Sequence, residues 1–242
     1  MHRPKNPQSP KGPDSAKGGE LSRLLTLWWD ALVHPDSARD LILKARGFDK
    51  FDRFLLVGVG LLYLSYGFSM GLFRGLFPAL IAGAKLPFLF LFTLLVCFPP
   101  LYVLNCLEDL RLSPAQTFRL LLVATSANAA AVASMTPVSL FFTLTAFDRT
   151  YQFLVLMHVA FFAFSGFTSM VVISLLFRAT AARVGRRLRP GLVVGWGLLY
   201  IFVGTQMSWV LRPWIGSLTV PYAAFRPLGG SFFEALWRLI GT

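Results

Sequence analysis

An apolar run of 22 residues, Leu86–Leu107, limits the possible folds of this chain more than any other feature. A helix rises ~1.5 Å per residue, so about 20 apolar residues cross the hydrocarbon layer of a bilayer. Pro99 and Pro100 lie two-thirds of the way along the run. Because proline has no backbone N–H, carbonyls one turn earlier lose their helical partners. Lipid cannot satisfy these carbonyls, so we expect protein to cover the broken side of this helix.

Four further runs are similarly long and apolar, and hydrophobic residues make up 55% of the 242 residues while charged residues make up 14%. This composition excludes an ordinary water-soluble domain. The sequence predicts an all-α integral membrane protein, a five-transmembrane-helix bundle with amphipathic interfacial helices near both termini. The membrane domain covers residues 54–211, and its spans lie at about 54–73, 86–107, 118–142, 153–177 and 192–211.

Small residues indicate how the spans pack. Gly67, Gly71 and Gly75 recur every four residues and form a bare stripe on the first span. Such a stripe lets a neighbouring helix approach closely. We expect tight packing within the chain, with a homodimer seam as the alternative. The middle of the third span is rich in Ala and Ser, which places it at the centre of the bundle against this stripe, and Pro137 is expected to kink its far end.

The segment between the first two spans, residues 75–84, is predicted as a short apolar loop at the outer surface. Whether it is interfacial or re-entrant stays open at this stage. The GTQMSWVLRPWIG run, which closes the fifth span, has two interpretations. It is either an anchored helix terminus or part of a docking surface.

The flanking segments differ from the spans. Residues 1–20 carry Pro, Gly, Lys and Ser without an apolar core, so we expect a disordered basic tail rather than a signal peptide. Residues 21–53 are predicted to form cytoplasmic or interfacial helices. Trp28 and Trp29 lie on an amphipathic helix that fits the membrane interface, and packing on other cytoplasmic protein is the alternative. The 212–242 tail is predicted to carry a second interfacial helix.

The distribution of basic residues predicts the orientation. With the N-terminus inside, inside segments hold 17 Lys and Arg residues and outside segments hold 6. This places the N-terminus in the cytoplasm and the C-terminus outside, in the cytoplasmic (inner) membrane of a bacterium. The net charge of +12 then indicates topology and contact with anionic lipid, rather than nucleic acid. The candidate contacts to lipid or to a partner protein are Trp28, Trp29, Arg183, Arg186, Arg187 and Arg189.

No motif for catalysis, cofactor binding or metal binding is present. GxSxG, HExxH and a phosphate-binding glycine loop are all absent. Cys97 and Cys106 are nine residues apart, or ~13 Å along a helix, which is too far for a disulfide. No ionisable residue other than His158 is expected between the ends of a span. The polar residues of the spans are Asn105, Asn128, His158 and Gln206.

Two stretches, KLPFLFLFTLLVCFPPLYVLN and GTQMSWVLRPWIG, carry a resemblance together with the Ala-rich third span. They resemble a family of uncharacterised bacterial multi-pass membrane proteins over residues ~30–235, which implies no particular activity. In architecture the chain is more remotely similar to the Yip-type five-span membrane proteins. That resemblance implies membrane trafficking or shaping and binding of small GTPases. The Asp-Leu-Tyr-Gly-Pro signature of the eukaryotic group is absent, and Tyr66-Gly67 is the part that matches.

The sequence therefore leads to two hypotheses. The first is a non-enzymatic membrane scaffold whose basic segments contact anionic lipid or a cytoplasmic or membrane protein partner. The second is a component of a small-solute transporter or channel. In that case a path would be lined by the helix break at Pro99 and Pro100 and by the polar residues Asn105, Asn128, His158 and Gln206.

Overall fold

The computed structural model describes residues 13–107, 109–145, 151–183, 185, 189–212, 214 and 215, together with Glu234 and Trp237. The elements in these residues are all helices. In chain order they are α1 (Pro13–Val33), α2 (Pro35–Leu43), α3 (Lys50–Gly71), the 3-10 helix η1 (Leu72–Arg74), α4 (Leu76–Leu107), α5 (Pro114–Ser134), α6 (Thr136–Thr145), α7 (Tyr151–Arg183) and α8 (Pro190–Val210).

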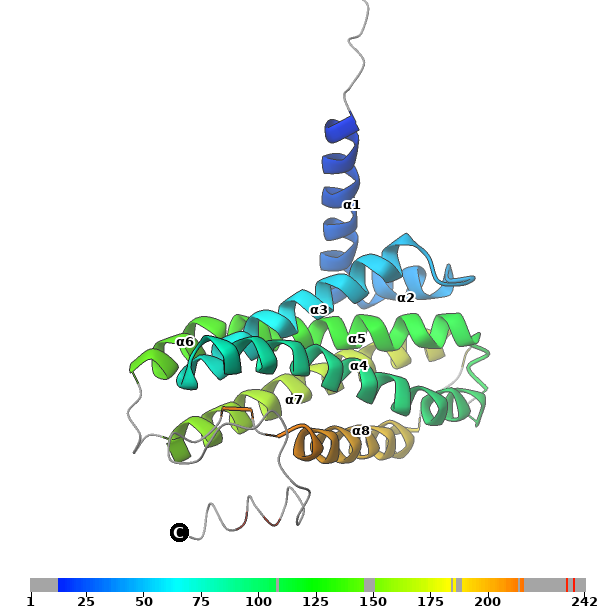
Figure 1. The fold of residues 1–242 in the computed structure, drawn as a ribbon. Coiled ribbons are helices and arrows are strands. Elements are labelled where there is room, and N and C mark those ends of the chain that lie inside the picture. Colours follow the sequence, from blue (N-terminus) through cyan, green and yellow to red (C-terminus); the bar gives the residue numbers. More distant parts are fainter. Residues whose placement is uncertain are drawn as a thin grey trace, which may run out of the picture.

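Five helical segments are long and apolar enough to cross a membrane: Lys50–Arg74, Leu76–Leu107, Pro114–Thr145, Tyr151–Arg183 and Val193–Val210. They run side by side in one bundle (Figure 1). The predicted all-α, five-span fold is confirmed. We call the end of the bundle where α3 and α5 begin the α2 end, and the opposite end, where α3 finishes, the η1 end.

Local side-chain bonds set where the spans begin. The Asp49 carboxylate accepts hydrogen bonds from the backbone amides of Phe51 and Asp52. The Asp52 carboxylate in turn accepts one from the Asp49 amide, and the two residues form a capping box at the start of α3. Ser113 and Gln116 form the same motif at the start of α5. These caps satisfy amides that have no partner within the first helical turn.

The third span, made of α5 and α6, is the most buried. Of its most apolar 18-residue window 67% is buried, against 17% for the windows of α7 and α8. The prediction that this Ala-rich helix lies at the bundle centre is confirmed. Its helix stops at Ser134 and resumes at Thr136, so the break expected near Pro137 is also present.

The segment 75–84 was wrongly predicted as a loop, because residues from Leu76 onward form the first turns of α4. Pro78 lies in the first turn, where its missing N–H removes no helical hydrogen bond. Ala79 and Ala82 are buried against α3 at Gly71 and Gly67. Close packing on α3 therefore extends the second span by almost three turns.

The glycine stripe packs on α4 rather than on the third span, which corrects a second expectation. A Cβ atom on Gly67 would lie 2.7 Å from the carbonyl oxygen of Ala82, and one on Gly71 would lie 2.6 Å from Cα of Ala79. Gly75 does not belong to the stripe. It lies between η1 and α4 with φ of 120°, and a Cβ atom there would meet nothing within 4 Å. Its role is the turn itself, because this φ favours glycine.

α4 continues through Pro99 and Pro100 as one helix. Trp196 of α8 covers the adjoining turn, where its indole Nε1 donates to the carbonyl oxygen of Cys97 at 3.2 Å. The side chains of Leu95 and Val96, one turn before the prolines, are exposed. The expected protein cover is therefore present at the Cys97 carbonyl, but it is absent at the side chains of Leu95 and Val96.

α1 begins at Pro13, so the prediction of disorder to residue 20 is wrong for residues 13–20. In Figure 1 this helix stands across the direction of the spans and projects from the bundle. Trp28 faces the bundle and donates from Nε1 to Oγ of Ser126 at 2.9 Å, whereas Trp29 on the other side is exposed. The helix expected here is thus present, and its placement at the membrane interface stays a prediction. The predicted C-terminal interfacial helix lies outside the described residues.

The packing of α3 on α4 leads to a first prediction. Gly→Ala inside a helix normally stabilises the helix, by about 1 kcal/mol. Gly60→Ala adds a methyl group in open space and should keep or raise the thermal unfolding midpoint in detergent. Gly67→Ala should lower it, because the new Cβ would press on the Ala82 carbonyl. Equal midpoints for the two variants would contradict the close approach of α3 and α4.

Candidate functional site

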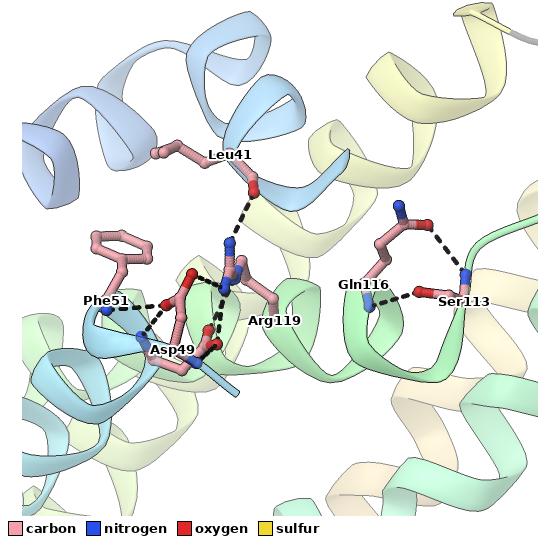
Figure 2. A network of polar contacts seen from close by, with 7 residues as sticks. Leu41, Asp49, Phe51, Ser113, Gln116 and Arg119 are labelled. Atoms are coloured by element: carbon pink, nitrogen blue, oxygen red, sulfur yellow. Dashed lines mark hydrogen bonds and ion pairs between the residues drawn. The ribbon is translucent and has the colours of Figure 1, made fainter. Parts of the chain in front are cut away.

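A buried ion pair joins α3 and α5 near the α2 end. The guanidinium of Arg119 donates from Nε to Oδ1 of Asp52 at 2.8 Å and from Nη2 to Oδ2 at 2.7 Å. Both side chains are 3% exposed. Two parallel bonds of this kind match the planar guanidinium to the carboxylate and fix its orientation. Figure 2 shows the Arg119 guanidinium with two further partners, Asp49 and Leu41.

The same guanidinium reaches two more groups. Nη2 lies 2.7 Å from Oδ2 of Asp49, and Nη1 donates to the carbonyl oxygen of Leu41 at 3.1 Å. Burial raises the pKa of the Asp49 carboxyl, but hydrogen bonds from Arg119 and from the amides of Asp52 and Phe51 outweigh burial and hold the pKa below its usual range. We call Arg119, Asp52, Asp49 and the Leu41 carbonyl the Arg119 anchor. It ties α2, α3 and α5 together.

The anchor corrects the expectation that the spans hold no ionisable residue besides His158. Asp52, Lys85 and Arg119 all lie in spanning helices and are buried. The Lys85 ammonium donates to the carbonyl oxygen of Leu211 at 2.8 Å, just past the end of α8. Terminal carbonyls of a helix lack partners within it, so this bond stabilises the end of α8 and joins it to α4.

A second set of polar groups lies between α3, α5 and α7, and we call it the interior polar cluster. The hydroxyl of Tyr63 donates to Oδ1 of Asn128 at 2.7 Å, and Nδ2 of Asn128 donates to Oγ of Ser165 at 3.4 Å. The hydroxyl of Tyr66 lies 2.6 Å from Nδ1 of His158. Each of these five side chains is buried.

Sequence reasoning named Asn128 and His158 but missed Tyr63 and Tyr66. A signal for the tyrosines exists: Val59, Tyr63, Tyr66 and Met70 recur at spacings of four, three and four residues, which is typical of one packed helix face. All four are buried. A tyrosine on such a face needs a hydrogen-bond partner on a neighbouring span.

Three buried polar atoms near α6 and α7 make no hydrogen bond to any described residue: Oγ1 of Thr136, Oγ1 of Thr143 and Nε2 of His158. His158 therefore binds Tyr66 through Nδ1, while its Nε2 has no hydrogen-bond partner among the described residues. The ring also meets Tyr66 and Phe161 edge to face. Its surroundings are thus mainly aromatic.

The other predicted residues lie apart from this cluster. Asn105 closes the turn between α4 and α5, where Nδ2 donates to the Leu112 carbonyl at 2.8 Å and Oδ1 accepts from the Leu112 amide at 3.4 Å. Gln206 is half-buried on α8, and Pro99 is exposed. Asn128 and His158 therefore bind neighbouring tyrosines of α3, namely Tyr63 and Tyr66. Asn105 lies apart from them, at the α2 end.

The basic residues after α7 are only partly described. Arg183 at the end of α7 and Arg189 at the start of α8 are exposed. Arg186 and Arg187 lie outside the described residues. In the described part of the chain, no group of three His, Cys, Asp or Glu side chains is placed to hold a metal ion. Cys97 is buried and Cys106 is exposed, and both are free thiols.

The five apolar spans and the polar groups buried between them define an α-helical multi-pass membrane protein. A comparison of the chain with protein-family models, curated proteins and solved structures finds no match. The two resemblances drawn from the sequence therefore stay predictions.

The Arg119 anchor leads to a second prediction. Arg119→Gln leaves the buried Asp52 carboxylate without its cation, and breaking a buried pair in this way costs about 3–5 kcal/mol. We expect a large fall in the thermal unfolding midpoint. The double variant Asp52→Asn/Arg119→Gln should recover part of it, because it removes the buried charge as well.

Arg111→Gln is the matched control. Arg111 is 77% exposed, and its Nε lies 3.4 Å from Oδ1 of Asp109. An exposed pair contributes about 0–1 kcal/mol, so this control should stay close to wild type. If Arg119→Gln unfolds at the same temperature as Arg111→Gln, the anchor does not stabilise the bundle.

Proposed function

We propose that this protein is a non-enzymatic membrane scaffold, or membrane-organising protein, that contacts anionic lipid or a cytoplasmic partner through α1 and its basic segments. The observation that carries this proposal is the outer face of α1. Its apolar side chains recur every four residues and are exposed by about half of their area: Leu21 52%, Leu25 45%, Trp29 63% and Val33 47%. We call these four residues the α1 stripe.

The α1 stripe is suited to an external contact. The opposite side of α1 is occupied, since Ala31 is buried and Leu24, Leu27 and Trp28 pack on the bundle core. A helix that is held on one face and presents a continuous apolar row on the other can bury that row in a lipid interface or against another protein. Both occupants are compatible with a scaffold.

The charge distribution supports the α2 end as the cytoplasmic end. Residues 1–53, which lead into α3, and residues 178–189, which join α7 to α8, hold 15 of the 23 Lys and Arg residues. A surplus of positive charge favours the cytoplasmic side. On this basis we propose a bacterial inner-membrane protein with its N-terminus in the cytoplasm and its C-terminus outside.

The hydrogen bonds inside the bundle favour a structural role for its buried polar side chains, which is to hold the helices together. Arg119, Asp52 and Lys85 are bonded to other parts of the chain, and Tyr63, Asn128 and Ser165 are bonded to each other. Side chains that hold helices together in this way are already engaged. One observation favours the alternative, a component of a small-solute transporter or channel: Nε2 of His158 is buried without a partner among the described residues.

The proposal predicts that the α1 stripe binds the lipid or the partner protein that contacts this chain. Leu25→Glu/Trp29→Glu places two charges on the stripe, and the control Ser22→Glu/Thr26→Glu places two charges at the same spacing on an exposed polar face of α1. After cross-linking in native membranes, proteins and lipids attached to each full-length variant are identified by mass spectrometry. The stripe variant should lose contacts that wild type and control keep.

Two results would contradict the proposal. One is an unchanged set of contacts in the stripe variant. The other is solute flux through purified wild-type protein in liposomes that disappears with His158→Ala or Asn128→Ala, which would favour the transporter or channel.

A further inference from the structure

The segment between α2 and the first turn of α3 alternates basic and acidic residues, and the fold separates the two kinds. Asp49 and Asp52 turn toward Arg119 and bind its guanidinium. Lys44, Arg46 and Arg53 are exposed. The Asp52 carboxylate is therefore withdrawn from the surface, whereas the Asp49 side chain, which shares the same guanidinium, stays 53% exposed.

Lys44, Arg46 and Arg53 differ from the other cations near them, because their side chains form no ion pair with a described residue. Arg39 is paired with Asp36 at 2.8 Å and with Asp40 at 3.2 Å. Lys50 is paired with Glu20 at 2.9 Å, and Arg111 with Asp109 at 3.4 Å. Within residues 39–53, the cations without an ion pair to a described residue are thus these three side chains.

An exposed aromatic residue lies between these cations in the sequence. Phe48 is 53% exposed, and its ring centroid is 6.5 Å from that of Phe118 on α5. The first span begins two residues later at Lys50, so the whole segment lies where the chain enters the bilayer. A headgroup there offers phosphate to the cations and acyl chain to the ring. Nucleic acid or an acidic protein surface would satisfy the cations but would leave Phe48 exposed.

We propose that Lys44, Arg46 and Arg53, which flank Phe48 in the sequence, form a binding site for the phosphate of an anionic phospholipid headgroup. We call these four residues the 44–53 cluster. This site rests on the proposed function, since it requires the α2 end to face an anionic leaflet. It adds a place and a ligand class, and it separates site residues from cations that are paired with acidic side chains.

The test compares two triple variants of the full-length protein that each remove three positive charges. Lys44→Gln/Arg46→Gln/Arg53→Gln alters the 44–53 cluster, and Arg39→Gln/Lys50→Gln/Arg111→Gln alters cations with acidic partners. Phosphatidylglycerol, phosphatidylcholine or inorganic phosphate is titrated into the detergent-solubilised protein, and bound lipid is counted by native mass spectrometry. Circular dichroism checks that both variants remain helical.

We expect wild type to prefer phosphatidylglycerol over phosphatidylcholine. Each surface cation changes the affinity about fivefold, so the loss of three should make the cluster variant bind phosphatidylglycerol about a hundredfold more weakly than the control. If the triple variant does not purify, Arg46→Gln in the loop between α2 and α3 should show about a fivefold loss on its own.

Equal losses in the two triple variants would overturn the site but leave the scaffold proposal intact, since general charge would then explain binding. Competition by inorganic phosphate at the same concentration as phosphatidylglycerol would overturn the lipid as ligand. A wild type without preference for phosphatidylglycerol would overturn the site and the proposed lipid contact together.

Discussion

The fold depends on one requirement, namely that a cation buried between spanning helices must find its partners inside the protein. Arg119 is 3% exposed and meets it with the carboxylates of Asp52 and Asp49 and with the carbonyl of Leu41. An isolated charge in such a place is very costly, so the pair forms only when α3 lies beside α5. The Leu41 bond adds α2 to this arrangement, and α1 follows because it packs on α2 and α5. The position of the amphipathic α1 is thus linked to a charge pair inside the bundle.

Two different kinds of contact hold the spans together. α3 meets α4 through Gly67 and Gly71, where missing side chains let the two backbones approach. α3 meets α5 and α7 through Tyr63 and Tyr66, whose hydroxyls reach polar atoms on those helices. The α4 side of α3 is therefore held by close backbone packing, and the side that meets α5 and α7 is held by hydrogen bonds. Because these polar groups are engaged with each other, the contacts with lipid or partners that we propose fall to the surfaces, above all to α1 and the 44–53 cluster.

Much of this arrangement follows from local sequence features. Long apolar runs predict the five spans, and the Ala-rich run predicts the central helix, because each is a property of neighbouring residues. The segment 75–84 was misread since it is short and lies between two charges, and only its contact with the glycines of α3 makes it helical. Asp52 and Arg119 look like ordinary flanking charges in the sequence. Their pairing joins residues 67 positions apart, and no local pattern encodes such a contact. Asn128 and His158 were found because polar residues are conspicuous in apolar runs, whereas their tyrosine partners resemble any aromatic residue of a span.

The central claim is that Tyr63, Asn128 and Ser165 form a hydrogen-bonded chain in an interior closed to water, so that the contacts we propose are made at the surfaces of the protein. The reactivity of a thiol at Ser165 tests it most directly, since Ser165 is fully buried beside Asn128. Cys97 and Cys106 are first replaced by alanine, and Ser165→Cys is then compared with Ser22→Cys on exposed α1 in reconstituted vesicles. A water-soluble thiol reagent should modify the cysteine at position 22 and leave the one at 165 unmodified. Similar rates at both positions would reveal water inside the bundle and contradict the account.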